Sequence, residues 1–171
     1  MTVIEAIRAR RSIRKFKKDA VVTDEQIKQL LEAAMLAPSA CNTRPWEFIV
    51  IKNREVLDQI RKTHPYTGML ETASLAIVMV ALPEAQERLD GLPRGFYPQD
   101  CGAATQNILL AAVELGLGTC WCGVYPKENR IAEMREILGT AKLPFCIIAV
   151  GMPDENPNPR GMYEESKVSY I

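Results

Sequence analysis

Basic side chains crowd the start of the chain: residues 8–18 hold seven of them and no acidic residue. Within this run, Arg10, Arg11 and Arg14 stand around Ser12. Guanidinium forks beside a hydroxyl suit a phosphate ester, which has three acceptor oxygens and a charge of about −1.5 to −2. An isolated charge run is more often a solvated surface, so an anion site and a solvated surface both stay open at this point.

A second polar segment, residues 37–46, places Ser39 and Asn42 between Pro38 and Pro45. The prolines restrict the path of the backbone, and the two polar side chains offer hydrogen-bond donors and acceptors beside apolar neighbours. A rigid loop of this kind suits a flat heteroaromatic ring. The simpler interpretation is the end of a helix followed by a loop into a strand.

A third segment, GLGTCWCG at residues 116–123, combines glycines with a short β-type run. Its simpler interpretation is a helix C-cap followed by a strand. The functional interpretation adds that backbone N–H groups near Gly123 can approach a ligand closely, because glycine has no side chain.

Several other chemistries are excluded or disfavoured. Gly116 and Gly118 look like half of a dinucleotide-binding fingerprint, but a helix precedes them and Trp121 stands where the third glycine belongs. No phosphate-binding GxxxxGK[ST] motif occurs. Because the chain has a single histidine, we expect no zinc site and no other metal site.

The isolated cysteines and the histidine have structural interpretations. Cys120 and Cys122 are separated by one residue, which differs from the C-x-x-C redox motif, and alternation along a strand predicts both thiols on the same face. His64 precedes Pro65 in a polar stretch, which predicts a solvent-exposed side chain without a catalytic role. Cys41 is expected to be a small filler.

The elements that position these segments follow from apolar spacing and from proline and glycine signals. A Thr23–Gln26 capping box opens a helix that Pro38 stops, and Gly139 ends another helix. Residues 74–81 are apolar on both faces and predict a central strand. Other helices are predicted at residues 3–10, 54–62, 100–115 and 126–139, and other strands at 46–51, 119–124, 145–150 and 167–171. Residues 82–99 predict a loop with one helical turn at 84–89.

Composition limits the class of protein. The 171 residues carry 21 basic and 21 acidic side chains, and this balance disfavours a general nucleic-acid binder. A hydrophobic content of 47% predicts a folded domain, which we place over residues 1–171 without a linker. No apolar run approaches the ~20 residues of a membrane span. Five cysteines without a framework spacing, and no secretory signal, predict reduced thiols and a cytoplasmic location.

Taken together and in order, these segments resemble the nitroreductase-like flavin oxidoreductases. The resemblance rests on RRSIRKF, PSACNTRPWEF, YPQDCGAATQNILLAA, LGLGTCW, and AVGMP before a Pro-rich tail. It implies an α+β fold with a mainly antiparallel central sheet flanked by helices, and an FMN site at the interface of a homodimer. It also implies that residues 152–171 form an arm that extends onto the partner subunit.

The resemblance also assigns roles to individual residues. Arg10 and Ser12 would hold the FMN phosphate, with Arg11 nearby, and Arg160 would close over it. Arg14 would face the pyrimidine end of the ring, and Gly123 would present its N–H to flavin N5. The residues implied to come from the partner subunit are Pro38, Ser39 and Asn42. Many members have a lysine two residues before the tail arginine, where Asn158 stands here, so a different phosphate contact is expected. An asparagine that larger members place against the ring has no counterpart in residues 66–69.

The implied activity is the reduction of nitroaromatic, quinone or similar acceptors by NADH or NADPH through FMN, in a ping-pong cycle with no protein nucleophile. The alternatives are another flavin reaction on the same fold, such as dehalogenation or enone reduction, and a non-catalytic FMN-binding or storage protein. A nucleic-acid or acidic-partner module remains a third class, which the scarcity of aromatic residues in the basic run disfavours. The lysines at 15, 17 and 18 are expected to be solvated.

Overall fold

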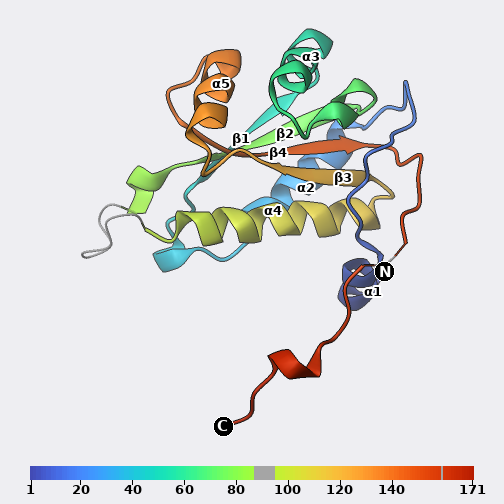
Figure 1. The fold of residues 1–171 in the computed structure, drawn as a ribbon, viewed down its shortest axis with the longest axis vertical. Helices are drawn as coiled ribbons and strands as arrows, with labels where there is room; N and C mark the ends of the chain where they lie inside the picture. The colour runs from blue at the N-terminus through green and yellow to red at the C-terminus, as the bar shows by residue number, and fades with distance from the viewer. Residues whose placement is uncertain (87–94, 159) are drawn as a thin grey trace.

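The sheet at the centre of the molecule has four antiparallel strands in the residues that the computed structural model describes, which are 1–86, 95–158 and 160–171 (Figure 1). The strands are β1 (Trp46–Ile51), β2 (Leu75–Ala81), β3 (Gly118–Gly123) and β4 (Leu143–Gly151). Their order in the sheet is β1-β2-β4-β3, so β1 and β3 form the two edges. The predicted α+β class with an antiparallel sheet is therefore confirmed.

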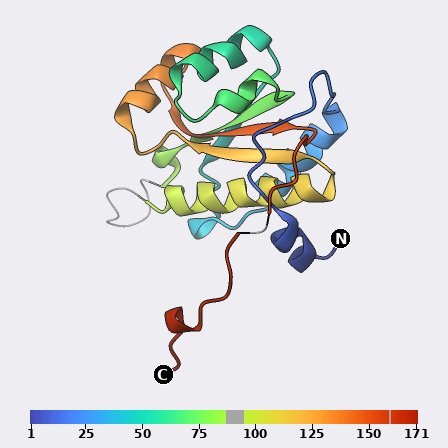
Figure 2. The ribbon, with the colours of Figure 1, turned by 45° about the vertical axis from the view of Figure 1, so that its right-hand side comes forward.

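Helices cover both faces of this sheet. The helices of the described residues are α1 (Val3–Ala9), which packs against α4, and α2 (Asp24–Met35), α3 (Arg54–Thr63), α4 (Tyr97–Glu114) and α5 (Glu128–Leu138). Figures 1 and 2 show α2 and α4 on one face and α3 and α5 on the other. Each face has its own apolar core, which accounts for the complete burial of β2 and confirms its central place.

Local signals define several helix ends as expected. The Thr23 side chain accepts a hydrogen bond from the Gln26 N–H, which confirms the capping box, and Gly139 adopts the left-handed conformation at the end of α5. Helix α4 starts at Tyr97, three residues before the predicted start, because Pro98 occupies a first-turn position where no intrahelical N–H is needed. Helix α5 starts at Glu128 rather than at Pro126.

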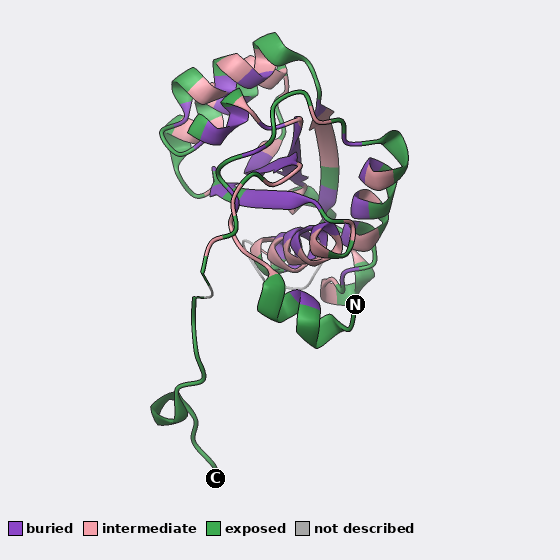
Figure 3. Ribbon diagram, turned by 90° about the vertical axis from the view of Figure 1, so that its right-hand side faces the viewer, coloured by how far each residue is buried: buried purple, intermediate pink, exposed green. Residues whose placement is uncertain are grey.

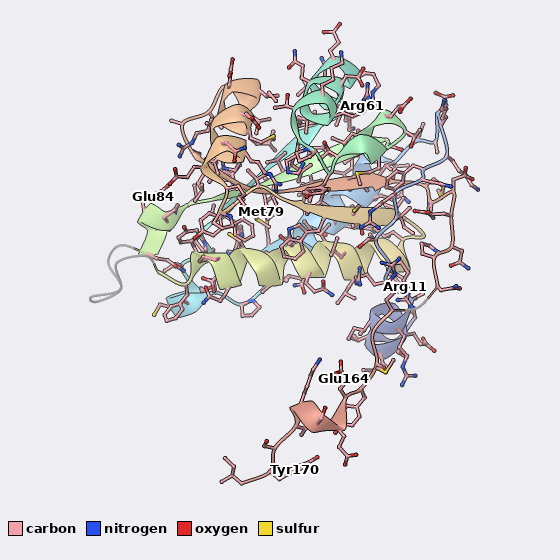
Figure 4. The ribbon with its side chains drawn as sticks, in the orientation of Figure 1. Arg11, Arg61, Met79, Glu84, Glu164 and Tyr170 are labelled. Carbon is pink, nitrogen blue, oxygen red and sulfur yellow. The ribbon has the colours of Figure 1, made fainter. Side chains whose placement is uncertain are left out.

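The segments outside the sheet differ most from expectation. A 3₁₀ helix at Pro83–Gln86 forms the start of the turn predicted at 84–89, whereas residues 87–94 lie outside the described residues. The strand predicted at 167–171 is wrong, because these residues pair with no strand and follow a 3₁₀ helix at Glu165–Lys167. The end of the chain extends away from the body with its side chains exposed, Tyr170 among them (Figures 3 and 4).

Candidate functional site

The basic run lines a cavity of about 200 Å³, which we call the arginine pocket. One side is formed by Arg10, Arg11, Ser12 and Arg14, and the other by Glu155, Pro157, Asn158 and Arg160. Two segments from opposite ends of the chain thus bring four arginines together around one glutamate. Such a cavity favours an anion. Lys15, Lys17 and Lys18 are exposed, as expected.

Backbone hydrogen bonds hold the two walls of the arginine pocket in place. Helix α1 ends at its C-cap Arg10, and the Ile13 N–H then donates to the Thr119 carbonyl of β3 at 2.9 Å. A side-chain oxygen of Glu155 accepts from the backbone N–H groups of Arg14 and Lys15. The single acidic group in the pocket is therefore engaged by the backbone of the basic run.

A larger cavity of about 440 Å³ adjoins the first along β3, and we call it the β3 pocket. Its lining includes Arg14, Tyr66, Met69, Cys120, Cys122 and Gly123. Arg14 lines both cavities, so the two adjoin at its side chain. The arginine pocket is rich in cationic groups, whereas the β3 pocket combines polar groups with the apolar surfaces of Met69, Tyr66 and Trp121. A ligand with an anionic group at one end of a planar apolar body matches this division.

Both thiols of the β3 pocket lie on the same face of the strand, as predicted, and both are buried. A hydrogen bond with Cys122, helped by the positive charges of Arg14 and Arg10, lowers the pKa of the Cys120 thiol to about 7. The same hydrogen bond and burial raise the pKa of Cys122. Of the two thiols, Cys120 therefore ionises more readily than Cys122.

The prediction that His64 is solvent-exposed is wrong. Its side chain is 3% exposed, and its Nε2 atom lies 3.0 Å from the carbonyl oxygen of Gly123. Its Nδ1 atom lies 3.3 Å from the backbone nitrogen of Tyr66. The polar residue before Pro65 correctly predicted a loop. It could not indicate that the His64 ring contacts Gly123 of β3, which lies 59 positions further along the chain.

The segment that holds Pro38, Ser39 and Asn42 lines neither pocket. It follows α2 and contacts the first turn of α4, where Asp100 accepts a hydrogen bond from the Ala40 N–H at 3.1 Å. In Figure 4, Glu84 marks that end of the molecule and Arg11 marks the opposite end. A single chain therefore brings Arg10, Arg11, Ser12, Arg14, Gly123 and Arg160 together but leaves these three residues apart.

Within this segment, the expectation that Cys41 is a small filler is wrong. Its side chain is exposed, and Cys41 and Asn42 both have a positive φ, of 49° and 55°. The loop keeps this shape through the Ser39 hydroxyl, which accepts from the Arg44 N–H at 2.9 Å. Asn42 is exposed and directed to solvent rather than into the chain's own core.

Three residues that sequence reasoning did not select contribute to the site. Glu155 anchors the basic run, and Tyr66 lines the β3 pocket. Arg130 of α5 donates to the Gly123 carbonyl at 3.1 Å and lies 5.2 Å from the centre of the Tyr66 ring. Their positions depend on contacts between distant segments, so local spacing could not indicate them. In the described residues, no group of three or more side chains is suited to a metal ion.

Comparison with known proteins gives a consistent result. A model of the nitroreductase family matches residues 7–64 and 61–152. The chain is 45% identical over 170 residues to a "Putative NADH dehydrogenase/NAD(P)H nitroreductase" of Methanothermobacter thermautotrophicus, covering 98% of this chain and 86% of that protein. A crystal structure of a protein of the same description from Parabacteroides distasonis has a TM-score of 0.89 at 35% identity, with 98% and 96% of the two chains covered. An FMN-dependent nitroreductase from Clostridium difficile has a TM-score of 0.85 at 32% identity, with 98% of each chain covered.

Proposed function

This chain belongs to the nitroreductase family, and on that basis we propose that it is an FMN-dependent oxidoreductase that uses NADH or NADPH to reduce a small organic acceptor. One observation carries the proposal: the arginine pocket and the β3 pocket meet at Arg14. FMN has the matching shape, with a phosphate at one end of a ribityl chain and a planar ring at the other. Nitroaromatic and quinone compounds are the acceptors that we propose.

The residues of the arginine pocket fit the phosphate of FMN. Arg10 and Ser12 would donate to its oxygens, and Arg11 and Arg160 would add positive charge. Asn158, at the position where the resemblance would place a lysine, can donate a neutral hydrogen bond from the same wall. Binding of the FMN phosphate would then depend on the basic run near the N-terminus more than on the C-terminal tail.

Gly123 provides a separate test of the fit. A Cβ atom added to this glycine would come no closer than 3.9 Å to another part of the chain, to the Tyr125 carbonyl oxygen. Packing within the chain therefore does not require glycine at position 123. A ligand ring that approaches the Gly123 N–H would require it, which supports the placement of flavin N5 at this residue.

When bound, FMN supplies hydride and electron transfer, whereas this chain supplies binding, orientation and electrostatics. Arg14 would place positive charge beside the pyrimidine end of the ring, and the Gly123 N–H would mark its central edge. NADH or NADPH would bind transiently over the exposed ring face and leave before the acceptor occupies the same place. No protein nucleophile is assigned a role.

We include a homodimer in the proposal, because Pro38, Ser39 and Asn42 line neither of the two pockets of their own chain. In a dimer they would complete the site of the partner subunit. The C-terminal arm supports this assembly: its large apolar side chains Met162, Tyr163 and Tyr170 are 84%, 73% and 90% exposed, and a partner surface would bury them.

The test is a visible absorption spectrum of the purified protein with FMN, followed by anaerobic addition of NADH or NADPH. A bound flavin that the nucleotide bleaches and a quinone or nitroaromatic re-oxidises is the expected result. A protein that takes up no FMN would contradict the proposal. A flavin that neither nucleotide reduces would indicate storage rather than catalysis.

A further inference from the structure

Two walls of the β3 pocket are joined by one buried side chain, His64. The Gly123 carbonyl oxygen is 3.0 Å from its Nε2 atom, and the Tyr66 backbone nitrogen is 3.3 Å from its Nδ1 atom. Both Gly123 and Tyr66 line the pocket. His64 itself is not among the lining residues, so its effect on a ligand would be exerted through these two neighbours.

The partners of the imidazole determine where its proton lies. A backbone carbonyl can only accept, so Nε2 must carry the hydrogen and donate it to Gly123. A backbone N–H can only donate, so Nδ1 must be unprotonated and accept from Tyr66. The geometry therefore requires a neutral ring with its proton on Nε2. An imidazolium, with a proton on each nitrogen, cannot accept the Tyr66 hydrogen bond.

The surroundings oppose protonation. Burial lowers the pKa of His64, and the positive charge of Arg130 lowers it further. The Gly123 carbonyl and the carboxylate of Glu133 act in the opposite direction. Arg130 also donates to the Gly123 carbonyl at 3.1 Å, and the Cys122 thiol lies 3.2 Å from the Tyr66 carbonyl oxygen. An imidazolium would thus stand beside a guanidinium and lose one of its two contacts.

We propose that His64 is a positioning residue that, as a neutral Nε2–H imidazole, holds Gly123 and Tyr66 against the β3 pocket, and that its protonation releases Tyr66 and weakens flavin binding. This inference rests on the proposed FMN site. In this proposal His64 is a pH-sensitive side chain that supports the wall of the β3 pocket from behind and contacts neither the cofactor nor the substrate.

The first experiment observes the ring directly. Because His64 is the only histidine in the chain, its ¹⁵N and ¹H signals in a nuclear magnetic resonance spectrum are unambiguous. At pH 8 we expect the Nε2–H tautomer, and on acidification we expect a midpoint below the ordinary value of about 6.5. An Nδ1–H tautomer, or a midpoint at or above that value, would overturn the proposal even in a chain that binds no flavin.

The second experiment measures the FMN dissociation constant of the wild type and of His64→Gln from pH 8 to pH 5. Glutamine can donate to Gly123 but does not titrate. The ratio of the two constants cancels the titration of the FMN phosphate, whose pKa is about 6. We expect similar affinities at pH 8 and a wild type that binds FMN progressively more weakly than His64→Gln as the pH falls through the folded-state pKa of His64. A ratio that does not change with pH would refute the inference.

Two further variants separate positioning from other causes. His64→Leu removes both contacts at similar volume, and we expect weaker FMN binding at every pH. Cys120→Ser removes the other group of this pocket that titrates near neutrality, and we expect it to retain the wild-type loss of affinity below pH 6. Abolition of that loss by Cys120→Ser would assign the pH dependence to the thiol instead. If the wild type fails to bind FMN at pH 8, the proposed function fails, while the tautomer measurement still decides the structural claim.

Discussion

The Ala40 backbone N–H donates to the Asp100 Oδ2 atom at 3.1 Å, which joins the loop after α2 to the first turn of α4. The same oxygen accepts from Gln86 Nε2 at 2.6 Å, and that amide group also donates to the Thr43 hydroxyl at 2.9 Å. One buried carboxylate therefore fixes the segment that we assign to the partner subunit's flavin site.

Replacement of this carboxylate should affect both stability and binding. Hydrogen bonds to a charged group contribute about 1.5–3 kcal/mol each, so Asp100→Asn should lower the free energy of unfolding by about that amount. It should also weaken FMN binding, because the loop around Asn42 loses its anchor. Urea unfolding and an FMN titration measure the two effects. Asp19→Asn, at an exposed position with positive φ, is the matched control and should change neither.

Gly123 and Gly118 lie at the two ends of β3 and should respond differently to alanine. Gly123→Ala has space within the chain, so we expect nearly unchanged stability and FMN binding weaker by roughly tenfold, or about 1.4 kcal/mol. At Gly118 the added Cβ would lie 2.9 Å from the Ile13 side chain, so Gly118→Ala should destabilise the fold by about 1–3 kcal/mol. Thermal unfolding with and without FMN separates the two cases. Equal losses of stability would argue against a ligand at Gly123.

Arg10→Ala should discriminate between FMN and riboflavin, which differ by the phosphate. Loss of a charge-assisted hydrogen bond costs about 1.5–3 kcal/mol, which corresponds to roughly 10- to 100-fold weaker FMN binding. Riboflavin affinity should stay the same, because the β3 pocket is unchanged. Fluorescence titration of both flavins provides the measurement. A parallel loss for riboflavin would place Arg10 near the ring instead of the phosphate.

Cys120 should be a pH-dependent target for thiol reagents in the flavin-free protein. Since its pKa is lowered to about 7, its alkylation by iodoacetamide should increase as the pH passes through that value. Added FMN should protect it by filling the β3 pocket. Cys101 is the internal control, because burial raises its pKa to about 12. Mass spectrometry of the Cys41→Ser protein, which lacks the exposed thiol, would quantify each site.

The buried histidine should also make stability depend on pH. Its pKa is lower in the folded chain than in the unfolded chain, where the ordinary value is about 6.5. The unfolded chain therefore binds the proton more readily, and the contribution of neutral His64 is present above pH 6.5 and is lost as the pH falls through the folded-state pKa. Urea unfolding from pH 8 to pH 5 should show a steeper decline for the wild type than for His64→Gln. Parallel curves would indicate that His64 ionises equally in both states.

The sequence was sufficient where a signal is local. The apolar run of β2 predicted a central strand, the Thr23–Gln26 pair predicted the start of α2, and the alternation of Cys120 and Cys122 predicted their common face. These features depend on neighbouring residues along the chain, so periodicity and capping chemistry capture them.

The errors arose where distant segments meet. His64 is buried and contacts Gly123 of β3. A polar residue before a proline does not indicate such a long-range contact. Residues 167–171 have the composition of a strand, but a strand needs a paired neighbour, and the described part of the chain provides none for them. The arrangement of the arginine pocket depends on Glu155, which reaches back to Arg14 over 141 positions. The basic run was therefore compatible with an anion site but did not indicate what anchors it.

Residues 12 and 13 also pair with Thr119, on the outer edge of β3, beside the run that we assign to phosphate binding. An uncovered strand edge is a template for association with another chain. Detachment of this segment would dismantle the anion site and expose that edge in the same event. We therefore expect aggregation of the flavin-free protein to decrease when FMN is supplied during expression, so that cofactor availability influences the yield of soluble protein as well as its activity.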